Sequence, residues 1–119
     1  MKNKIICFDL DNVIKFTKKN HYKKSKPNKK SIKLINNLYN YGYIIKIFTA
    51  RFMGRSKENV TLAKKRGYKF TYDQLKKWNV KFHKLIFGKP SFDIFIDDKA
   101  LFFKKNWQPF IKKKFLIKN

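Results

Sequence analysis

Acidic residues are scarce in this chain, and most of them gather in two tight pairs. The sequence holds seven acidic residues against 31 basic ones. Asp9 and Asp11 directly follow one apolar run, and Asp97 and Asp98 directly follow another. Because neighbouring carboxylates repel, we expect a positive group between the two pairs. Mg²⁺ prefers oxygen ligands and suits a site of few carboxylates that a substrate phosphate completes.

The apolar runs before the acid pairs have the composition of buried strands. Helical patterns separate these runs along the chain. Strands that alternate with helices predict an α/β fold with a parallel sheet and right-handed crossovers. The predicted strands are residues 5–8, 43–48, 84–87 and 94–96.

Helix and loop signals fill the segments between the predicted strands. Apolar residues at helical spacing predict a helix that ends at Gly42. A second helix is predicted over residues 57–66, with Gly67 as its end, and Thr71 is suited to cap a further short helix. The stretch 12–28 is polar and rich in lysine, and we predict a loop or flap there with a short hairpin around Phe16 and Tyr22.

The order of strands and polar residues predicts where a site should form. In open α/β sheets, ligands bind beyond the carboxyl ends of the strands. Each acid pair follows its strand directly, and a threonine follows the strand 43–48. The residues that we expect to meet at this edge are Asp9, Asp11, Thr49, Asp97 and Asp98.

Four short motifs occur in the order and with the spacing of a known enzyme superfamily. Residues 8–13 carry an Asp-x-Asp after the first strand, and residues 48–51 carry a threonine at the end of the second. Lys89 supplies a basic residue, and residues 96–98 supply an acidic pair after the last strand. Together these motifs resemble the haloacid-dehalogenase superfamily of phosphohydrolases over residues 4–100.

The resemblance implies a three-layer Rossmann-like parallel sheet in one domain, residues 1–119. The stretch 71–100 is similar to small members described as capsule- or polysaccharide-biosynthesis phosphatases, and no insertion is long enough for a cap domain. Where the first motif of the family continues with Gly-Thr, this chain has Asn12 and Val13, and Asn tolerates the turn that Gly permits. Lys89 lies so close to the last strand that the helix which often carries it must be short or missing.

The resemblance also implies a role for each residue of the reaction centre. Asp9 would attack phosphorus and form an aspartyl-phosphate. Asp11 would protonate the leaving oxygen and then activate water for the second step. Thr49 would donate a hydrogen bond to a phosphoryl oxygen, and Lys89 would balance the charge of nucleophile and phosphate.

A Mg²⁺ site and a substrate-binding region complete this implied centre. The ion would be held by the Asp9 carboxylate, the Asp11 backbone carbonyl and Asp97, with Asp98 in support. It would offset the repulsion between the carboxylate and the incoming phosphate. The residues predicted to contact the rest of the substrate are Arg51 and Asn12.

The net charge of +24 invites a nucleic-acid interpretation. However, only Arg51, Arg55 and Arg66 among the 31 basic residues are arginine, the residue that phosphate and guanine recognition usually favours. Lys, Asn, Ile, Phe and Tyr share A/T-rich codons, so genome bias alone can produce this composition. A charge of this size still attracts anionic substrates.

These observations leave three functions, and we favour the first. The leading hypothesis is a phosphomonoesterase acting on a sugar phosphate or a related small metabolite. One alternative is a phosphatase for nucleotides or nucleic-acid ends, because the basic stretch 18–30 flanks the predicted site. The other is a non-catalytic basic module that binds nucleic acid. The sequence does not determine the oligomeric state.

The cellular setting follows from cysteine usage and hydropathy. Cys7 is the single cysteine and has no partner within the chain for a disulfide, which favours a reducing, cytoplasmic setting. No apolar run approaches the ~20 residues that span a bilayer, so we expect no membrane partner. The start of the chain is too short and too acidic for a secretory signal.

Overall fold

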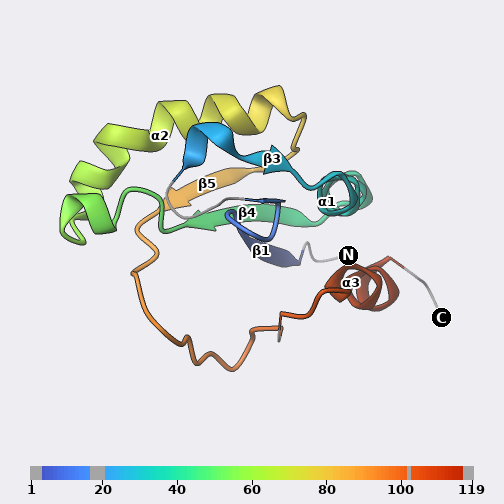
Figure 1. Cartoon of the computed structure of the whole chain (residues 1–119). Helices are drawn as coiled ribbons and strands as arrows, with labels where there is room; N and C mark the ends of the chain where they lie inside the picture. The colour runs from blue at the N-terminus through green and yellow to red at the C-terminus, as the bar shows by residue number, and fades with distance from the viewer. Residues whose placement is uncertain (1–3, 17–20, 102, 117–119) are drawn as a thin grey trace.

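Three parallel strands form the sheet that positions the site (Figure 1). They are β1 (Ile5–Asp9), β4 (Ile44–Thr49) and β5 (Lys84–Phe87), in the spatial order β1-β4-β5. The structure is a computed structural model that describes residues 4–16, 21–101 and 103–116. The strands predicted at 5–8, 43–48 and 84–87 are therefore confirmed within one residue of their bounds.

The register of the sheet aligns the strand ends that carry polar residues. Asp9 pairs with Phe48 across β1 and β4, and Thr49 pairs with Phe87 across β4 and β5. Ile45 and Ile47 of the central strand are fully buried. A buried central strand holds the carboxyl edge of the sheet rigid, which is the property that a site on this edge needs.

Helix α1 (Lys29–Tyr41) follows the sequence prediction closely. The Asn28 side chain accepts a hydrogen bond from the Ser31 backbone N–H and so caps its first turn. Gly42 ends the helix with a φ of 113°, a conformation that glycine adopts without steric cost. The apolar face of α1 packs against β4 and places Ile35 and Leu38 in the core.

Helix α2 (Val60–Lys77) is one continuous helix, so the predicted break at Gly67 and the separate helix capped by Thr71 are wrong. Gly67 is buried inside α2 because the Phe52 ring packs against it. A Cβ on Gly67 would lie 2.2 Å from that ring. The glycine is therefore a packing residue and not a stop signal, a distinction that local sequence does not reveal.

The predicted flap contains the predicted hairpin. Strands β2 (Lys15–Phe16) and β3 (Lys26–Pro27) pair in antiparallel fashion, and the 3₁₀ turn η1 (Tyr22–Lys24) lies between them. Residues 17–20 of the flap lie outside the described part of the chain. The Gln74 side chain donates to the Tyr22 carbonyl at 2.9 Å, so α2 holds the flap over the sheet edge.

The segment after β5 differs from the prediction. Residues 94–96 form no strand, and Ile94 and Ile96 are 77% and 90% exposed. The chain leaves β5 through Gly88 (φ 106°), and the Glu58 carboxylate then accepts hydrogen bonds from the Ser91 backbone N–H and hydroxyl. This tether directs the chain outward, and Figure 1 shows the orange segment running away from the sheet before it returns.

Helix α3 (Trp107–Phe115) brings the end of the described chain back to the body. Trp107 is buried beside Phe8, with 6.0 Å between the ring centroids. The Tyr43 hydroxyl donates to the Phe115 carbonyl at 2.7 Å. The described chain thus forms a mixed α/β fold with three helices on a small parallel sheet. Among the described residues, no helix combines the length and apolarity needed to cross a membrane.

Candidate active site

Asp9 and Lys89 face each other where β1 and β5 end. Asp9 is the last residue of β1, and Lys89 follows β5 by two residues. The Lys89 ammonium lies 3.4 Å from the Asp9 Oδ1 atom. The Lys89 backbone N–H donates to the Thr49 carbonyl at 3.2 Å, which fixes the loop that carries the lysine. The predicted proximity of nucleophile and lysine is therefore present.

Burial perturbs the Asp9 carboxyl. Partial removal from water raises its pKa, because the charged form loses hydration. The Lys89 ammonium opposes this shift through its charge and hydrogen bond, whereas the Asp11 carboxylate adds to it. A carboxyl with a perturbed pKa beside a cation, at the edge of a cleft, is a typical candidate for a reactive group.

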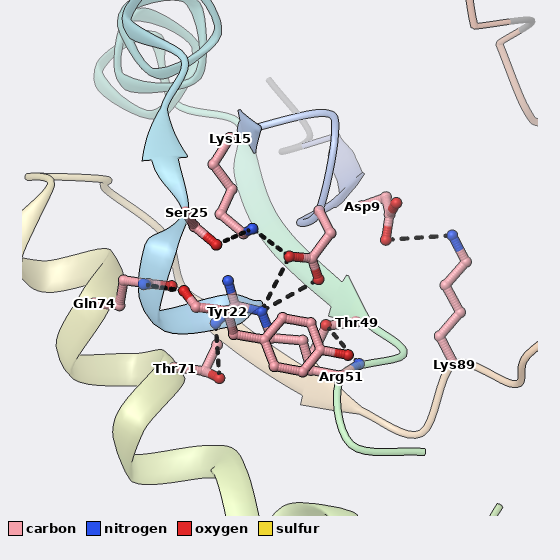
Figure 2. A network of polar contacts seen from close by, with 10 residues as sticks. Asp9, Lys15, Tyr22, Ser25, Thr49, Arg51, Thr71, Gln74 and Lys89 are labelled. Carbon is pink, nitrogen blue, oxygen red and sulfur yellow. Dashed lines mark hydrogen bonds and ion pairs between the residues drawn. The ribbon is translucent and has the colours of Figure 1, made fainter. Parts of the chain in front are cut away.

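Asp11 is held by two cations from different parts of the chain (Figure 2). The Lys15 ammonium forms an ion pair with the Asp11 Oδ1 atom. The Arg51 Nε atom lies 3.2 Å from each Asp11 carboxylate oxygen. The carboxylate is 22% exposed, whereas both cations are fully buried. These contacts therefore fix the orientation of the Asp11 carboxylate at the cleft.

The Lys15 ammonium is itself tightly bound by the flap. It donates to the Ser25 hydroxyl oxygen at 2.6 Å, next to β3. Burial lowers the pKa of Lys15 from 10.5 to about 8, with the nearby Arg51 charge adding to the effect and Asp11 opposing it. No motif marked this residue, because Lys15 is one of many lysines in a polar stretch.

Arg51, predicted to contact substrate, is fully buried and bonds to protein groups. Its Nη1 atom donates to the Thr71 hydroxyl oxygen at 3.2 Å, and its guanidinium lies 4.7 Å from the Tyr22 ring centroid. Burial lowers the Arg51 pKa, and Asp11 opposes that shift. Thr71, predicted as a helix cap, thus serves as a partner of Arg51. Contact between Arg51 and substrate stays a prediction.

Thr49 lies at the expected strand end but is fully buried. Its hydroxyl oxygen accepts a hydrogen bond from the Arg51 backbone N–H at 3.0 Å. The hydroxyl hydrogen is not used by that bond, so donation to a phosphoryl oxygen stays a prediction.

An open cleft of about 400 Å³ joins these groups. Residues from the ends of β1, β4 and β5 and from the flap line it. Its walls include Asp9, Asp11, Asn12, Tyr22, Arg51, Phe52, Arg55, Lys89 and Phe92. A second cleft, of about 370 Å³ beside Trp78, has no carboxylate in its lining and offers no comparable chemistry.

Two features of the cleft wall extend the sequence prediction. Asn12 has a φ of 69°, so it adopts the turn conformation expected where the family has glycine. Tyr22 contacts two guanidinium groups, with Arg51 at 4.7 Å and Arg55 at 5.1 Å from its ring centroid. Neither Tyr22 nor Arg55 was predicted as a site residue. The sequence predicted the hairpin, but which side chains reach the cleft depends on tertiary packing.

The second acid pair does not join the first in this structure. Asp97 and Asp98 lie in the exposed segment after β5, and the Asp97 carboxylate accepts a hydrogen bond from the Lys99 backbone N–H. Within the described residues, no group of three or more His, Cys, Asp or Glu side chains could hold a metal ion. The expected convergence is not present in this arrangement, because it depended on a strand over residues 94–96 that the structure does not form.

This arrangement does not supply a full ligand set for Mg²⁺. Asp9 has its carboxylate beside Lys89, and the Asp11 carboxylate is held by Lys15 and Arg51. Two carboxylates that already contact cations fall short of the oxygen-rich coordination that Mg²⁺ requires. The metal-ligand roles predicted for Asp97 and Asp98 stay predictions.

Comparisons with known proteins identify a structural neighbour but no family. Neither the protein-family models nor the curated proteins gave a match to this chain. A crystal structure of a structural-genomics target from Vibrio cholerae is similar, with a TM-score of 0.76 and 26% sequence identity. The similarity covers 82% of each chain. It supports the mixed α/β fold over most of the molecule.

Proposed function

We propose that this chain is a phosphomonoesterase of the haloacid-dehalogenase type, with Asp9 as nucleophile. One observation carries the proposal. The Asp9 carboxylate ends a parallel strand at a cleft, with a lysine at 3.4 Å and a second, fixed carboxylate two residues away. Nucleophile, cation and acid–base group are the three elements that phosphate-ester hydrolysis requires. A three-layer Rossmann-like architecture belongs to the same proposal.

In the first half of the reaction, a carboxylate oxygen of Asp9 forms a bond to phosphorus. The bond between phosphorus and the leaving oxygen breaks, and that oxygen takes a proton from Asp11. The Lys89 ammonium lies beside the Asp9 oxygen and offsets the combined negative charge of this carboxylate and the incoming phosphate. The products of this half are an aspartyl-phosphate and the free alcohol.

In the second half, Asp11 removes a proton from water, and the resulting hydroxide attacks phosphorus. The bond between phosphorus and the Asp9 oxygen breaks, which restores Asp9 and releases inorganic phosphate. Lys15 and Arg51 contact the Asp11 carboxylate and hold it in position for this proton transfer. Asp11 receives back the proton that it gave away, so the cycle is balanced.

The proposal includes Mg²⁺ as cofactor on one structural condition. The outer edge of β1 carries no strand in the described residues, and Ile5 on β1 is 57% exposed. The apolar residues 94–96 are exposed as well. Pairing of this segment with the edge of β1 would bury both and bring Asp97 level with Asp9. When bound, Mg²⁺ would neutralise part of the phosphate charge.

A disulfide test addresses this condition directly. Placing Asp97 level with Asp9 in a parallel register puts Phe95 beside Cys7, the single cysteine, which is exposed on β1. Adjacent strands are about 4.8 Å apart, which is within disulfide reach. We expect Phe95→Cys to form an intrachain disulfide under mild oxidation with Mg²⁺, and Leu101→Cys to form none. Equal cross-linking of both variants would reject the docked strand.

The reaction itself is tested by the fate of the phosphoryl group. Phosphate release from sugar phosphates, nucleotides and end-phosphorylated oligonucleotides should require Mg²⁺ and should vanish in Asp9→Asn. When wild type is quenched with acid during turnover of a substrate with a radioactive phosphoryl group, the label should be found on the peptide that contains Asp9, because Asp9 forms the aspartyl-phosphate. Label found only in phosphate, together with full activity of Asp9→Asn, would exclude Asp9 as nucleophile.

A further inference from the structure

Lys15 differs from the other lysines that the structure describes because it alone is fully buried. A genome biased toward A/T-rich codons explains exposed lysines, because their ammonium groups keep their hydration. It does not explain a buried ammonium, whose loss of hydration is expensive. The local chain forces this placement: the Asn12 backbone N–H donates to the Lys15 carbonyl at 2.6 Å, and Asp11 and Lys15 form a backbone bridge.

We propose that Lys15 is a positioning residue that, together with Arg51, fixes the orientation of the Asp11 carboxylate at the cleft. The inference rests on the proposed function and adds a residue that the motifs do not contain. Lys15 comes from β2 of the flap, whereas Arg51 follows β4, so the carboxylate is held from two separate elements. Rotation of Asp11 away from the cleft would break both ion pairs.

Each cation is in turn fixed by a hydroxyl group. Ser25 accepts from the Lys15 ammonium at 2.6 Å, and Thr71 accepts from the Arg51 Nη1 atom at 3.2 Å. The contacts thus run from the flap through Asp11 to helix α2, and Figure 2 shows both cations and both hydroxyl groups. Supporting contacts of this kind hold a reactive side chain in productive geometry, to which reaction rates are very sensitive.

The inference differs from a purely structural role for Lys15 as a flap anchor. A mere anchor would affect all substrates alike, through stability or binding. A residue that positions the acid should matter most when the leaving oxygen needs a proton. Alkyl phosphates have such a leaving group, whereas nitrophenyl phosphate releases an anion that is stable without protonation.

The test compares these two substrate types in Lys15→Met, with Lys26→Met as the matched control from the same hairpin, where the lysine is exposed. We expect kcat of Lys15→Met for glycerol phosphate to fall by about 10- to 100-fold, part of the 10²- to 10⁴-fold typical of acid–base catalysis. For nitrophenyl phosphate we expect a fall below about threefold, with KM unchanged, and Lys15→Arg should restore part of the lost rate. Lys26→Met should match wild type on both substrates.

A second variant tests the same role while it leaves Lys15 in place. Ser25→Ala removes the hydroxyl that fixes the Lys15 ammonium and should give the same substrate selectivity at smaller amplitude. Equal losses on both substrates in Lys15→Met and Ser25→Ala, or no loss on either, would overturn the positioning role while the phosphatase proposal stands. A wild-type protein that hydrolyses neither substrate would overturn both.

Discussion

The contact between Lys89 and Asp9 yields the most direct quantitative prediction. Replacing Lys89 by Met keeps most of the side-chain volume and removes the charge 3.4 Å from the Asp9 oxygen. Lys89 lowers the Asp9 pKa, whereas burial raises it. Without the ammonium, the effect of burial is no longer opposed by this neighbour, and the Asp9 pKa in the variant should rise above its wild-type value.

The size of this rise follows from distance and exposure. At 3.4 Å, two unit charges interact by about 5 kcal/mol at an effective dielectric constant of about 20, and by about 1 kcal/mol at about 80. The side chains of Lys89 and Asp9 are 19% and 33% exposed, so water screens the pair and the low end applies. An interaction of about 1 to 2 kcal/mol corresponds to roughly one pKa unit.

The measurement is a carboxyl NMR titration of Asp9 in wild type and Lys89→Met, without Mg²⁺ and at low salt. The metal is left out because a bound cation would itself lower the pKa of Asp9. Lys84→Met serves as the matched control. Lys84 is exposed and begins β5, at the opposite end of the strand from the loop that carries Lys89. Added salt should reduce the difference between the two proteins.

An Asp9 pKa that is unchanged or lower in Lys89→Met would refute the reasoning. It would mean that the ammonium does not sit beside the nucleophile in solution. A similar rise in Lys84→Met would point instead to the net charge of the whole chain. Only a rise confined to Lys89→Met supports a specific pair.

Three further predictions concern stability. Lys15→Met should stabilise the protein near neutral pH by about 3 kcal/mol, because burial lowers the pKa of Lys15 from 10.5 to about 8. The gain, measured by thermal unfolding, should shrink as pH rises from about 8 to 10.5, and a constant gain would contradict this prediction. Asp9→Asn should also stabilise the protein near neutral pH, because burial raises the Asp9 pKa. In urea unfolding, this gain should disappear at a pH low enough to protonate Asp9 in both folded and unfolded wild type. A gain that persists at that pH would contradict the prediction. Gly67→Ala should destabilise by about 1 kcal/mol, since crowding of the Phe52 ring outweighs the gain in helix propensity. Gly54→Ala, with nothing within 4 Å, is its control, and a stabilised Gly67→Ala would show that Phe52 packs elsewhere.

Local patterns were sufficient for most of the elements. The apolar runs ending at Asp9, Thr49 and Phe87 became the parallel strands, since a buried strand needs only a short apolar stretch between polar ends. Gly42 ended its helix as predicted. Gly67 did not, because its role depends on the Phe52 ring, a contact between separate elements.

The candidate site was predictable only where strand ends define it. Asp9, Asp11 and Lys89 meet at the cleft because parallel strands place their carboxyl ends on one edge. The segment 94–96 has the composition of a strand but no partner in this arrangement, and a strand without a partner leaves its backbone groups to water. Composition alone does not decide such a pairing.

The sequence by itself determined which carboxylates end which strands, because hydrophobic runs and their polar ends are local features. Only the tertiary structure decided what those carboxylates contact. The ion pairs of Asp11 with Lys15 and Arg51 join the flap to the loop after β4, and side chains from distant segments meet only when the chain packs. A buried charge must find a partner wherever the fold provides one, and local sequence does not specify that partner.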